Sequence, residues 1–512
     1  MTTQTLAPGP SVRRMRLLAP APRRRYLVPA VLAGVFVVTE GLAQALTPFI
    51  RNDDWPFLLP PNTHGVLPVS YYDKSEGRWL NTVWWTLVGQ HGTVTTAAMT
   101  YALAYVVLVA GMWRVLHLSG IRPRPAVDAL LGATLYASAV WVQLLYWPGT
   151  LTASVIVGAV AIWLLPWAAR SRRRLALWLL AAEAAAVLTY PPVGVVLLVF
   201  TVLLLREAPW RRVLAVLATW LGAFALGVFI AYSLNWLLNG HFRLQLASWR
   251  HPNPLTSFEA LVTNVGRWFS AVGDLWAAQW WLALVALAGI ALGWRRATVR
   301  HRLERLLLTF AVALGLDAVQ TLVTGVVTEP RGQLWTWSLA VLPAALLLLD
   351  HRERTTDQPE QTIDERDRAE QPAPRLGPAA RAGTALLAVL AVGGVLAWRG
   401  DIGEHQAVRQ QYEKIATAAT GNRAGADSSL VIVYQDPDLS PTRSGQIMAS
   451  TLMMAVQQEQ GGAIPRRCSP TECFEVAARL AIHPATGTVV PLGQADGRDL
   501  VAVVVPVPPR WL

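Results

Sequence analysis

The sequence predicts a mainly α-helical fold: a polytopic bundle of about eleven membrane-spanning helices, followed by a small α/β module. Hydrophobic residues make up 53% of the 512-residue chain and charged residues only 15%, against roughly 25% charged residues in soluble proteins. Apolar runs of bilayer-spanning length recur along the chain, with most charges between them. The 23 tryptophans agree with this, because tryptophan is enriched at bilayer interfaces. The composition therefore predicts an integral membrane protein.

The net charge of +12 predicts how the helices are oriented in the membrane. Arginines gather in short segments between the apolar runs, around 13–25, 122–124, 170–174, 211–212 and 295–305. Short basic loops mark the cytoplasmic side of a membrane protein, so the basic N-terminal segment 1–25 is expected in the cytoplasm. No nucleic-acid partner is expected, because the basic residues are not interleaved with aromatic residues as in a nucleic-acid platform. Membrane lipids are the expected surroundings.

The apolar runs divide the chain into a transmembrane domain, 26–350, and one later span. A span needs about 20 mostly apolar residues. We expect spans at 26–50, 94–118, 126–146, 150–168, 174–189, 192–206, 213–237, 279–294, 305–327, 335–349 and 383–398. This order places the arginine clusters inside and the loops 51–93 and 238–278 outside. Ala43-Gln44-Ala45 imitates a signal-peptidase site, but the apolar run continues past it, so the first helix is expected to be retained.

The first outer loop, 51–93, combines prolines with a short amphipathic segment. Its four prolines prevent one continuous helix. The stretch 79–90 (WLNTVWWTLVGQ) repeats large apolar residues about four apart, which predicts a helix lying in the membrane interface. The second outer loop, 238–278, resembles it, with aromatic residues among polar ones.

The C-terminal part of the chain changes character twice. Segment 351–382 is charged, rich in Pro and Gln and poor in aromatic residues, which predicts a disordered cytoplasmic linker. After the last span, 383–398, the segment 399–512 is expected outside the membrane as an α/β module. Its predicted elements are two strands and a helix, at 430–436 (LVIVYQD), 500–507 (LVAVVVPV) and 444–460.

The module contains both cysteines of the chain, Cys468 and Cys473. If the module lies on the oxidising side of the membrane, we expect a disulfide between them. A zinc site would need more ligands than this neighbourhood offers.

Asp53 and Asp54 are the first candidate catalytic residues, because they follow the first span directly on the predicted outer side. A carboxylate there can act as general base on a hydroxyl group within its reach. The alternative is a hydrated loop start without chemistry. The same loop also supplies the cations Lys74 and Arg78, which favours the catalytic interpretation.

The order of motifs in this region resembles that of membrane glycosyltransferases of the GT-C superfamily, closest to the O-antigen glucosyltransferase group. That group has an aspartate pair in a long outer loop after the first span, followed by a Gly-Arg-Pro-Leu-type motif. Here the matching segments are Asn52-Asp53-Asp54 and Gly77-Arg78-Trp79-Leu80, with Trp in place of Pro. Thr189-Tyr190-Pro191 lies at an outer hairpin where the group often has Tyr-Gln, and Glu329-Pro330-Arg331 is similar to a late Pro-Arg.

The resemblance implies a GT-C-like fold and a location in the bacterial plasma membrane. It implies transfer of a sugar from a polyprenyl-phosphate-linked donor to an extracytoplasmic acceptor, a cell-envelope glycan or a protein, usually with inversion. Asp54 or Asp53 would take the proton of the acceptor hydroxyl.

Cations would stabilise the lipid-phosphate leaving group as negative charge develops on it. Arg331 is the first candidate, because an arginine fork suits phosphate. The further candidates are Arg78, Lys74 and Arg51. The alternative for each is a side chain that reaches out to lipid headgroups.

Further substrate-binding candidates lie near the outer ends of the spans: Tyr190, Tyr146, Trp147 and His91. The aromatic rings can line a sugar or lipid pocket, or they can belong to an interfacial aromatic belt. His91 and His64, together with the aspartate pair, would also permit a divalent metal site, although nothing fixes their spacing. We expect no cofactor.

Acidic residues inside the spans support a second functional interpretation. In a transporter or lipid flippase, Glu183 and Asp317 would carry protons or substrate. Alternatively, they form interhelical hydrogen bonds. A third interpretation is a non-catalytic membrane scaffold whose exterior module binds a partner. The enzyme needs the outer-loop acids, the transporter needs the intramembrane acids, and the scaffold needs mainly the module.

Overall fold

The computed structural model describes most of the chain downstream of residue 70. The described residues are Gly34, 50–51, 54, 57, 59, 70–88, 94–121, 123–246, 250–349, 377–420, 430–434, 443–459, 465–482, 489–495 and 497–505. Nearly all of the predicted first span, 26–50, and of the predicted linker, 351–382, lies outside them. The site candidates Asp53 and His91 lie outside them as well.

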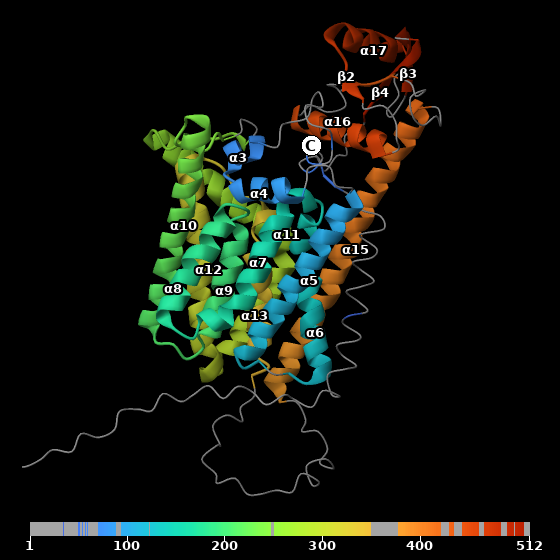
Figure 1. Cartoon of the computed structure of the whole chain (residues 1–512). Helices are drawn as coiled ribbons and strands as arrows, with labels where there is room; N and C mark the ends of the chain where they lie inside the picture. The colour runs from blue at the N-terminus through green and yellow to red at the C-terminus, as the bar shows by residue number, and fades with distance from the viewer. Residues whose placement is uncertain are drawn as a thin grey trace, which may run out of the picture.

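Six helices of the described part are long and apolar enough to cross a membrane. They are α5 (Val94–Leu118), α7 (Pro148–Ala168), α10 (Trp210–Asn239), α11 (Phe258–Trp294), α12 (Ala297–Thr324) and α15 (Pro378–Thr420). Between and beside them stand the shorter helices α6 (Pro125–Tyr136), α8 (Arg172–Val187), α9 (Pro192–Leu204) and α13 (Trp335–Leu346) (Figure 1). The predicted helical bundle is confirmed, and its six long apolar helices indicate a multi-pass membrane protein.

The segment predicted as one span, 126–146, is not a continuous helix. α6 ends at Tyr136, and a separate 3-10 helix, η1, covers Trp141–Leu144. Between them the Ser138 hydroxyl accepts hydrogen bonds from the backbone N–H groups of Val140 and Trp141. A serine that satisfies backbone donors in this way competes with the helix, which the apolar composition alone does not reveal.

The segment predicted as the second outer loop, 238–278, is helical from Phe258 onward and continuous with the predicted span 279–294. Ser257 begins this helix, because its hydroxyl accepts a hydrogen bond from the N–H of Ala260. One residue inside, Gln279, has non-helical backbone angles. These angles form a kink that divides the 37 residues of α11 into two helical parts.

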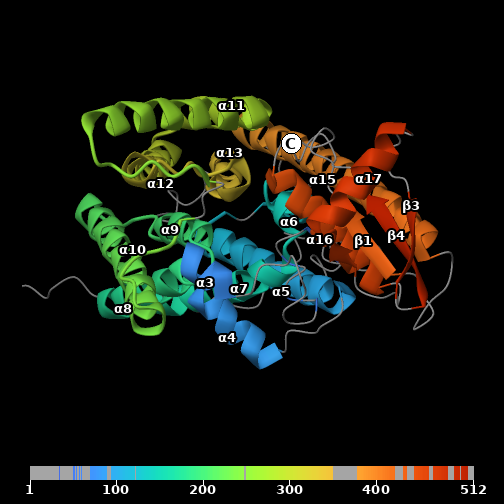
Figure 2. The ribbon, with the colours of Figure 1, turned by 90° about the horizontal axis from the view of Figure 1, so that it is seen from above.

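The predicted interfacial helix of the first outer loop is observed as α4 (Trp79–Val88), which follows α3 (Ser70–Glu76) and lies across the end of α7 (Figures 1 and 2). Asn81 and Trp85 are its buried residues, and Trp85 stacks on Phe57 with 4.2 Å between the ring centroids. Its exposed residues include Val83 and Leu87. An outward face that is apolar agrees with a helix at a membrane surface.

α15 is much longer than the predicted span 383–398. It has 43 residues, so it extends over roughly 65 Å. The part beyond the predicted span leads to the C-terminal module, and its side chains His405 and Tyr412 are buried. This extension is therefore a packed element of the fold.

The C-terminal module contains a mixed four-stranded sheet with strand order β2-β1-β4-β3. β1 (Leu430–Tyr434) is parallel to β2 (Arg466–Arg467) and to β4 (Arg498–Val504), while β3 (Val489–Ala495) is antiparallel to β4. Helices α16 (Arg443–Glu459) and α17 (Pro470–Ile482) complete it (Figure 1). The two predicted strands and the predicted helix are confirmed, whereas β2, β3 and α17 have no counterpart in the sequence prediction.

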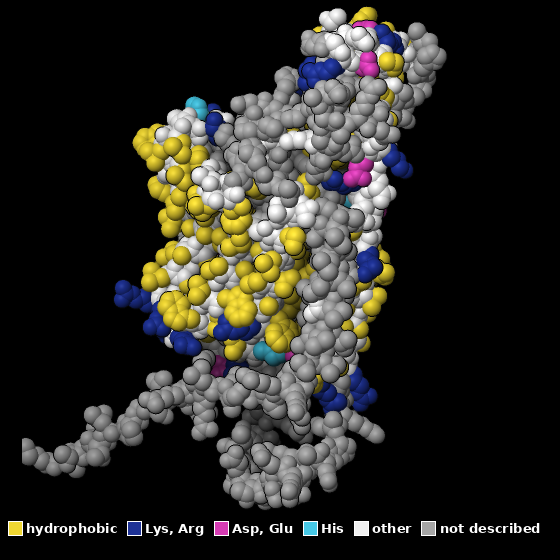
Figure 3. Space-filling view, turned by 45° about the vertical axis from the view of Figure 1, so that its right-hand side comes forward, with side chains coloured by type: hydrophobic (Ala, Val, Ile, Leu, Met, Phe, Trp, Pro, Cys, Tyr) yellow, Lys and Arg dark blue, Asp and Glu magenta, His cyan; other side chains and the backbone are white. Residues whose placement is uncertain are grey.

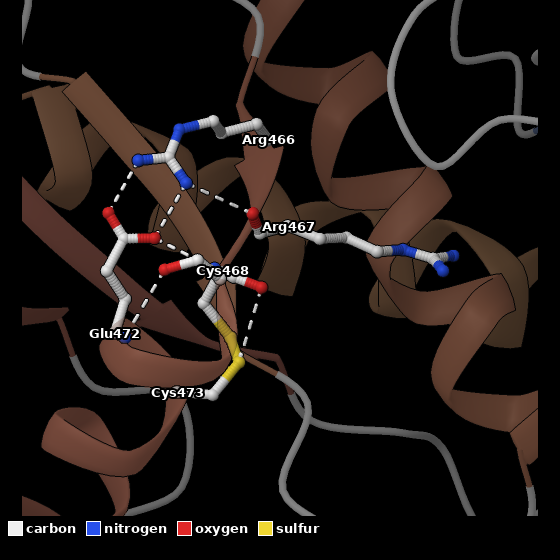
Figure 4. A network of polar contacts seen from close by, with 6 residues as sticks. Arg466, Arg467, Cys468, Glu472 and Cys473 are labelled. Carbon is white, nitrogen blue, oxygen red and sulfur yellow. Dashed lines mark hydrogen bonds and ion pairs between the residues drawn. A yellow bond between two sulfur atoms is a disulfide. The ribbon is translucent and has the colours of Figure 1, made fainter.

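Cys468 and Cys473 form the expected disulfide, which encloses the start of α17 (Figure 4). Within it Ser469 and Glu472 form a capping box. The Glu472 carboxylate accepts a hydrogen bond from the Ser469 N–H at 2.8 Å, and the Ser469 hydroxyl accepts one from the Glu472 N–H at 3.4 Å. Capping boxes often carry an apolar contact between the residue before the cap and the fourth helical residue. The two cysteines occupy these positions, so a covalent bond replaces that contact.

The capping box makes the stability of α17 depend on pH. A bidentate hydrogen bond from Arg466, with N–O distances of 2.7 and 2.5 Å, lowers the pKa of Glu472 from 4.5 to about 2. A carboxyl group whose pKa is lowered by folding stabilises the folded state above its unfolded pKa, and this stabilisation is lost as the pH falls through the folded pKa. We therefore expect α17 to lose stability between pH 4.5 and about 2.

Hydrogen–deuterium exchange of the α17 amides, corrected for the intrinsic rate at each pH, measures this loss. Glu472→Gln is expected to remove the pH dependence in that window. Glu475→Gln on the same helix is the matched control and is expected to retain it. The same pH dependence in wild type and Glu472→Gln would contradict the prediction.

Arginines at one end of the bundle donate hydrogen bonds to carbonyls at the C-terminal ends of neighbouring helices. The donors are Arg212 of α10, Arg296 before α12, and Arg302 and Arg305 of α12. Their respective acceptors follow α7, α13, α5 and α9: Ala169, Leu347 with Leu349, Ser119, and Leu205 with Arg206. Such carbonyls have no partner within their own helix. The clusters at 211–212 and 295–305 thus lie together at what we call the arginine-rich end.

Candidate functional site

At the opposite end of the bundle, Asp54 is attached to the start of α7. Its side chain is 1% exposed, and its carboxylate accepts hydrogen bonds from the backbone N–H groups of Gly149 and Thr150, the latter at 2.8 Å. The first N–H groups of a helix have no partner within the helix and favour a negative charge. A Cβ atom at position 149 would lie 2.8 Å from the Asp54 Cγ, so only glycine permits this approach. Asp54 is therefore held in one orientation by the backbone of α7.

Two arginines stack on the indole of Trp147, the residue directly before α7. The guanidinium carbon of Arg51 lies 5.0 Å from the ring centroid and that of Arg331 lies 4.4 Å from it. Arg51 is also held by its backbone N–H, which donates to the carbonyl of Tyr146 at 2.8 Å. Arg331 is presented by a short 3-10 helix, η3 (Pro330–Gly332). Planar guanidinium groups suit such stacking. The Arg331 Nε also forms an ion pair with the Glu329 carboxylate.

A third arginine, Arg78, lies over the ring of Tyr190 at 5.3 Å from its centroid. Arg78 and Arg250 both form ion pairs with Glu76. Burial alone would raise the pKa of Glu76, but the charges of Arg78, Arg250 and Arg331 hold that pKa below its ordinary value. Because Arg331 acts on Glu76 as well as stacking on Trp147, the two arginine groups belong to one site.

The phenol of Tyr190 lies close enough to Arg78 and Arg331 for their charges to act on it. Its pKa is raised by burial, against the opposing effect of Arg78 and Arg331. The phenol is therefore protonated at neutral pH and can donate a hydrogen bond. Position 190 is in the turn between α8 and α9, where the resemblance places a motif residue.

His405 is a site residue that the sequence analysis misses. Its Nε2 accepts a hydrogen bond from the Arg51 Nε at 3.2 Å, its Nδ1 donates to the Asp401 carbonyl at 2.7 Å, and its ring stacks on Tyr146 with 3.7 Å between the centroids. These two hydrogen bonds require the neutral ring with the proton on Nδ1. His405 lies on the part of α15 beyond the predicted span, so no local motif indicates it.

Glu76 and Arg250 are two more site residues without a prediction. Glu76 directly precedes the Gly77-Arg78 motif, and an acid at this position could have been paired with Arg78 on spacing alone. Arg250 comes from the segment between α10 and α11, far away in the sequence, and nothing local marks it. Lys74, by contrast, contributes mainly its backbone: its carbonyl accepts from Gln245 N–H at 2.9 Å and from Asn235 Nδ2 at 3.2 Å.

Three buried polar atoms near this site have no hydrogen-bond partner among the described residues: Tyr101 Oη, Asn81 Oδ1 and Trp147 Nε1. Asn81 donates to the Thr150 carbonyl at 2.8 Å, so it lies at the same helix start as Asp54. Tyr101 interacts electrostatically with Asp54 and Tyr190. Buried polar atoms without partners are uncommon in proteins, and they mark places that water or a polar ligand can satisfy.

The intramembrane acids occupy different surroundings. Glu183 of α8 is 2% exposed, accepts a hydrogen bond from Trp220 Nε1 of α10 at 2.6 Å, and lies directly against Gly194 of α9. It thus links three helices. Asp317 is partly buried near the C-terminal end of α12, beside Gln333 and Trp268.

The structure does not test the metal alternative. Among the described residues, no group of three or more His, Cys, Asp and Glu side chains is placed to hold a metal ion. Three of the four residues on which that alternative depends, Asp53, His64 and His91, lie outside the described part.

Comparison of the chain with protein-family models, with curated proteins and with solved structures found no match. The arrangement itself can hold an anion of phosphate type: three aromatic-stacked arginines lie next to a carboxylate fixed at a helix start and to unpaired polar atoms.

Proposed function

We propose that this protein is an integral-membrane glycosyltransferase that transfers a sugar from a polyprenyl-phosphate-linked donor to an extracytoplasmic acceptor, a cell-envelope glycan or a protein. The observation that carries the proposal is the pair of arginines, Arg51 and Arg331, on Trp147, one residue before the helix start that binds Asp54. The proposal places this end of the bundle on the outer face of a bacterial plasma membrane and the arginine-rich end in the cytoplasm.

The arginines suit the leaving group of such a reaction. When the bond between the anomeric carbon and the phosphate oxygen breaks, the electron pair goes to the phosphate, which gains negative charge. Cations already fixed in position stabilise that charge without reorganising. Arg331 and Arg51 are fixed by Trp147, and Arg78 is fixed by Tyr190 and Glu76. The apolar helices next to the site suit the polyprenyl chain.

The carboxylates suit the acceptor. The acceptor oxygen forms a new bond to the anomeric carbon, and its proton passes to a carboxylate. Asp54 is the first candidate for this base, because its carboxylate is fixed in position at the start of α7. The adjacent Asp53 is the second candidate, with Asp54 then fixing the loop that carries it. Attack from the face opposite the phosphate inverts the anomeric centre.

The transporter interpretation is less well supported. It requires Glu183 to exchange protons or substrate, whereas the hydrogen bond from Trp220 and the contact with Gly194 favour an interhelical link. The scaffold interpretation assigns no role to the three stacked arginines, Arg51, Arg78 and Arg331.

Substitution of Arg331 tests the proposal. We expect Arg331→Gln to weaken binding of polyprenyl phosphate to the purified protein by roughly 10- to 100-fold, the range for loss of a charge-assisted hydrogen bond. Native mass spectrometry with polyprenyl phosphate as the probe measures this binding. Envelope glycans of cells that carry only the variant are expected to lose the modification present with wild type.

The exposed Arg243, in the segment after α10, is the matched control, because Arg243→Gln removes the same charge elsewhere on the same end. It is expected to bind the probe as wild type does. Unchanged probe binding and unchanged glycans in Arg331→Gln, at normal protein levels, would falsify the proposed function.

A further inference from the structure

Five arginines at the arginine-rich end form no ion pair with any described residue. They are Arg114 near the C-terminal end of α5, Arg170 after α7, and Arg172, Arg173 and Arg174 in the first turn of α8. No acidic residue occurs in α5 or α7, and the acid of α8, Glu183, is buried about 16 Å along the helix from Arg172. Among the described residues, therefore, no ion pair neutralises the charge of these five arginines.

Arg114 is stacked on a tryptophan that faces outward from the bundle. Its guanidinium carbon lies 4.9 Å from the centroid of Trp163 in α7, and its Nη1 donates to the Trp163 carbonyl at 3.1 Å. The indole lies against Gly111 of α5 and donates from Nε1 to the Val107 carbonyl at 2.9 Å. Trp163 is nevertheless 41% exposed. The indole ring of Trp163, with the Arg114 guanidinium stacked on it, is therefore partly exposed at the surface of the bundle.

A second pair of the same kind lies one helical turn further along α7. The guanidinium carbon of Arg174 lies 5.1 Å from the centroid of Trp167, which is 49% exposed. Between the two tryptophans, Leu164 is also exposed. Figure 3 shows an arrangement of this kind on the face that it displays, with yellow side chains on the side of the bundle and dark-blue side chains towards its lower end.

We propose that these two arginine–tryptophan pairs bind the headgroup of an anionic phospholipid in the leaflet at the arginine-rich end. The phosphate would accept hydrogen bonds from Arg114 and Arg174, and the acyl chains would lie on Trp163, Trp167 and Leu164. Three observations select this occupant. The cations are unpaired, arginine forks suit phosphate, and the stacked indoles lie at the boundary between apolar surface and basic rim, where headgroups lie. The proposal is independent of the glycosyltransferase function.

Native mass spectrometry of the purified full-length protein tests it with two lipid probes, phosphatidylglycerol and phosphatidylcholine. We expect wild type to prefer phosphatidylglycerol, and Arg114→Gln with Arg174→Gln to reduce that preference by about 30-fold. Arg295→Gln with Arg211→Gln removes the same charge from two exposed arginines of the same end and is expected to leave the preference largely intact. Addition of inorganic phosphate is expected not to displace the lipid.

Several results would overturn the proposal. Equal binding of the two lipids by wild type would do so, as would an equal effect of the two double variants, which indicates a diffuse charge effect. Displacement by inorganic phosphate would show a site for a soluble anion. If the Arg114 variant does not fold, Arg174→Gln alone is decisive, because Arg174 is exposed, and an unchanged lipid preference in it contradicts the proposal.

Discussion

Asp54→Asn is expected to lower the rate of sugar transfer by roughly 10²- to 10⁴-fold, the contribution of a general base, while the protein stays folded. Asparagine keeps one oxygen that can accept a hydrogen bond from the start of α7, but it cannot take a proton from the acceptor hydroxyl. The second backbone N–H group loses its acceptor, which should cost roughly 1–3 kcal/mol of stability. Transfer measured in membranes and thermal unfolding of the purified variant give the two quantities separately.

Gly149→Ala is the matched variant for Asp54, since it retains the carboxylate and displaces it. A Cβ atom there would lie 2.8 Å from the Asp54 Cγ, so the carboxylate has to move. We expect a smaller loss of rate than in Asp54→Asn, without any change in charge. If Asp54→Asn transfers sugar at the wild-type rate, Asp54 only caps the start of α7. Asp53 is then the remaining candidate for the general base.

Trp147→Ala is expected to lower the free energy of unfolding by about 3–5 kcal/mol, as for other buried large-to-small changes. Trp147 is buried, and its ring also supports Arg51 and Arg331. Binding of polyprenyl phosphate should therefore fall together with stability. Chemical unfolding in detergent micelles and the mass-spectrometric assay measure these two effects.

Trp147→Phe separates the two contributions, because a smaller ring keeps a stacking face for the arginines. We expect it to retain most of the lipid-phosphate binding. Trp276→Ala, at an exposed tryptophan of α11, is expected to change neither quantity appreciably. If Trp147→Ala loses stability but binds polyprenyl phosphate normally, the arginines do not depend on the indole.

Much of the bundle could be predicted because its signal is local. The predicted span 94–118 has the observed bounds of α5, and the predicted helix 444–460 nearly coincides with α16. The errors occur where hydrogen bonds of a single polar side chain determine where a helix ends or begins. Ser138 interrupts the segment 126–146, and Ser257 starts α11 about twenty residues before the apolar run that predicted it.

The site was predictable only where its residues belong to local sequence motifs. Arg51, Arg78, Arg331, Tyr190 and Trp147 were selected from motifs and from their place near the outer ends of spans, and the structure brings these five together. His405 and Arg250 join them through tertiary contacts with residues 354 and 174 positions away in the sequence. No pattern of composition or spacing contains such contacts.

The length of α15 has a mechanical consequence. A continuous helix resists bending, so the C-terminal module and the ring of His405 belong to the same stiff element. A rotation of the module about this axis would turn His405 relative to Tyr146 and pull on its hydrogen bond with Arg51. A domain on a flexible tether could move without affecting the bundle. This module cannot, because its displacement would change the position of His405 and thereby the hydrogen bond to Arg51.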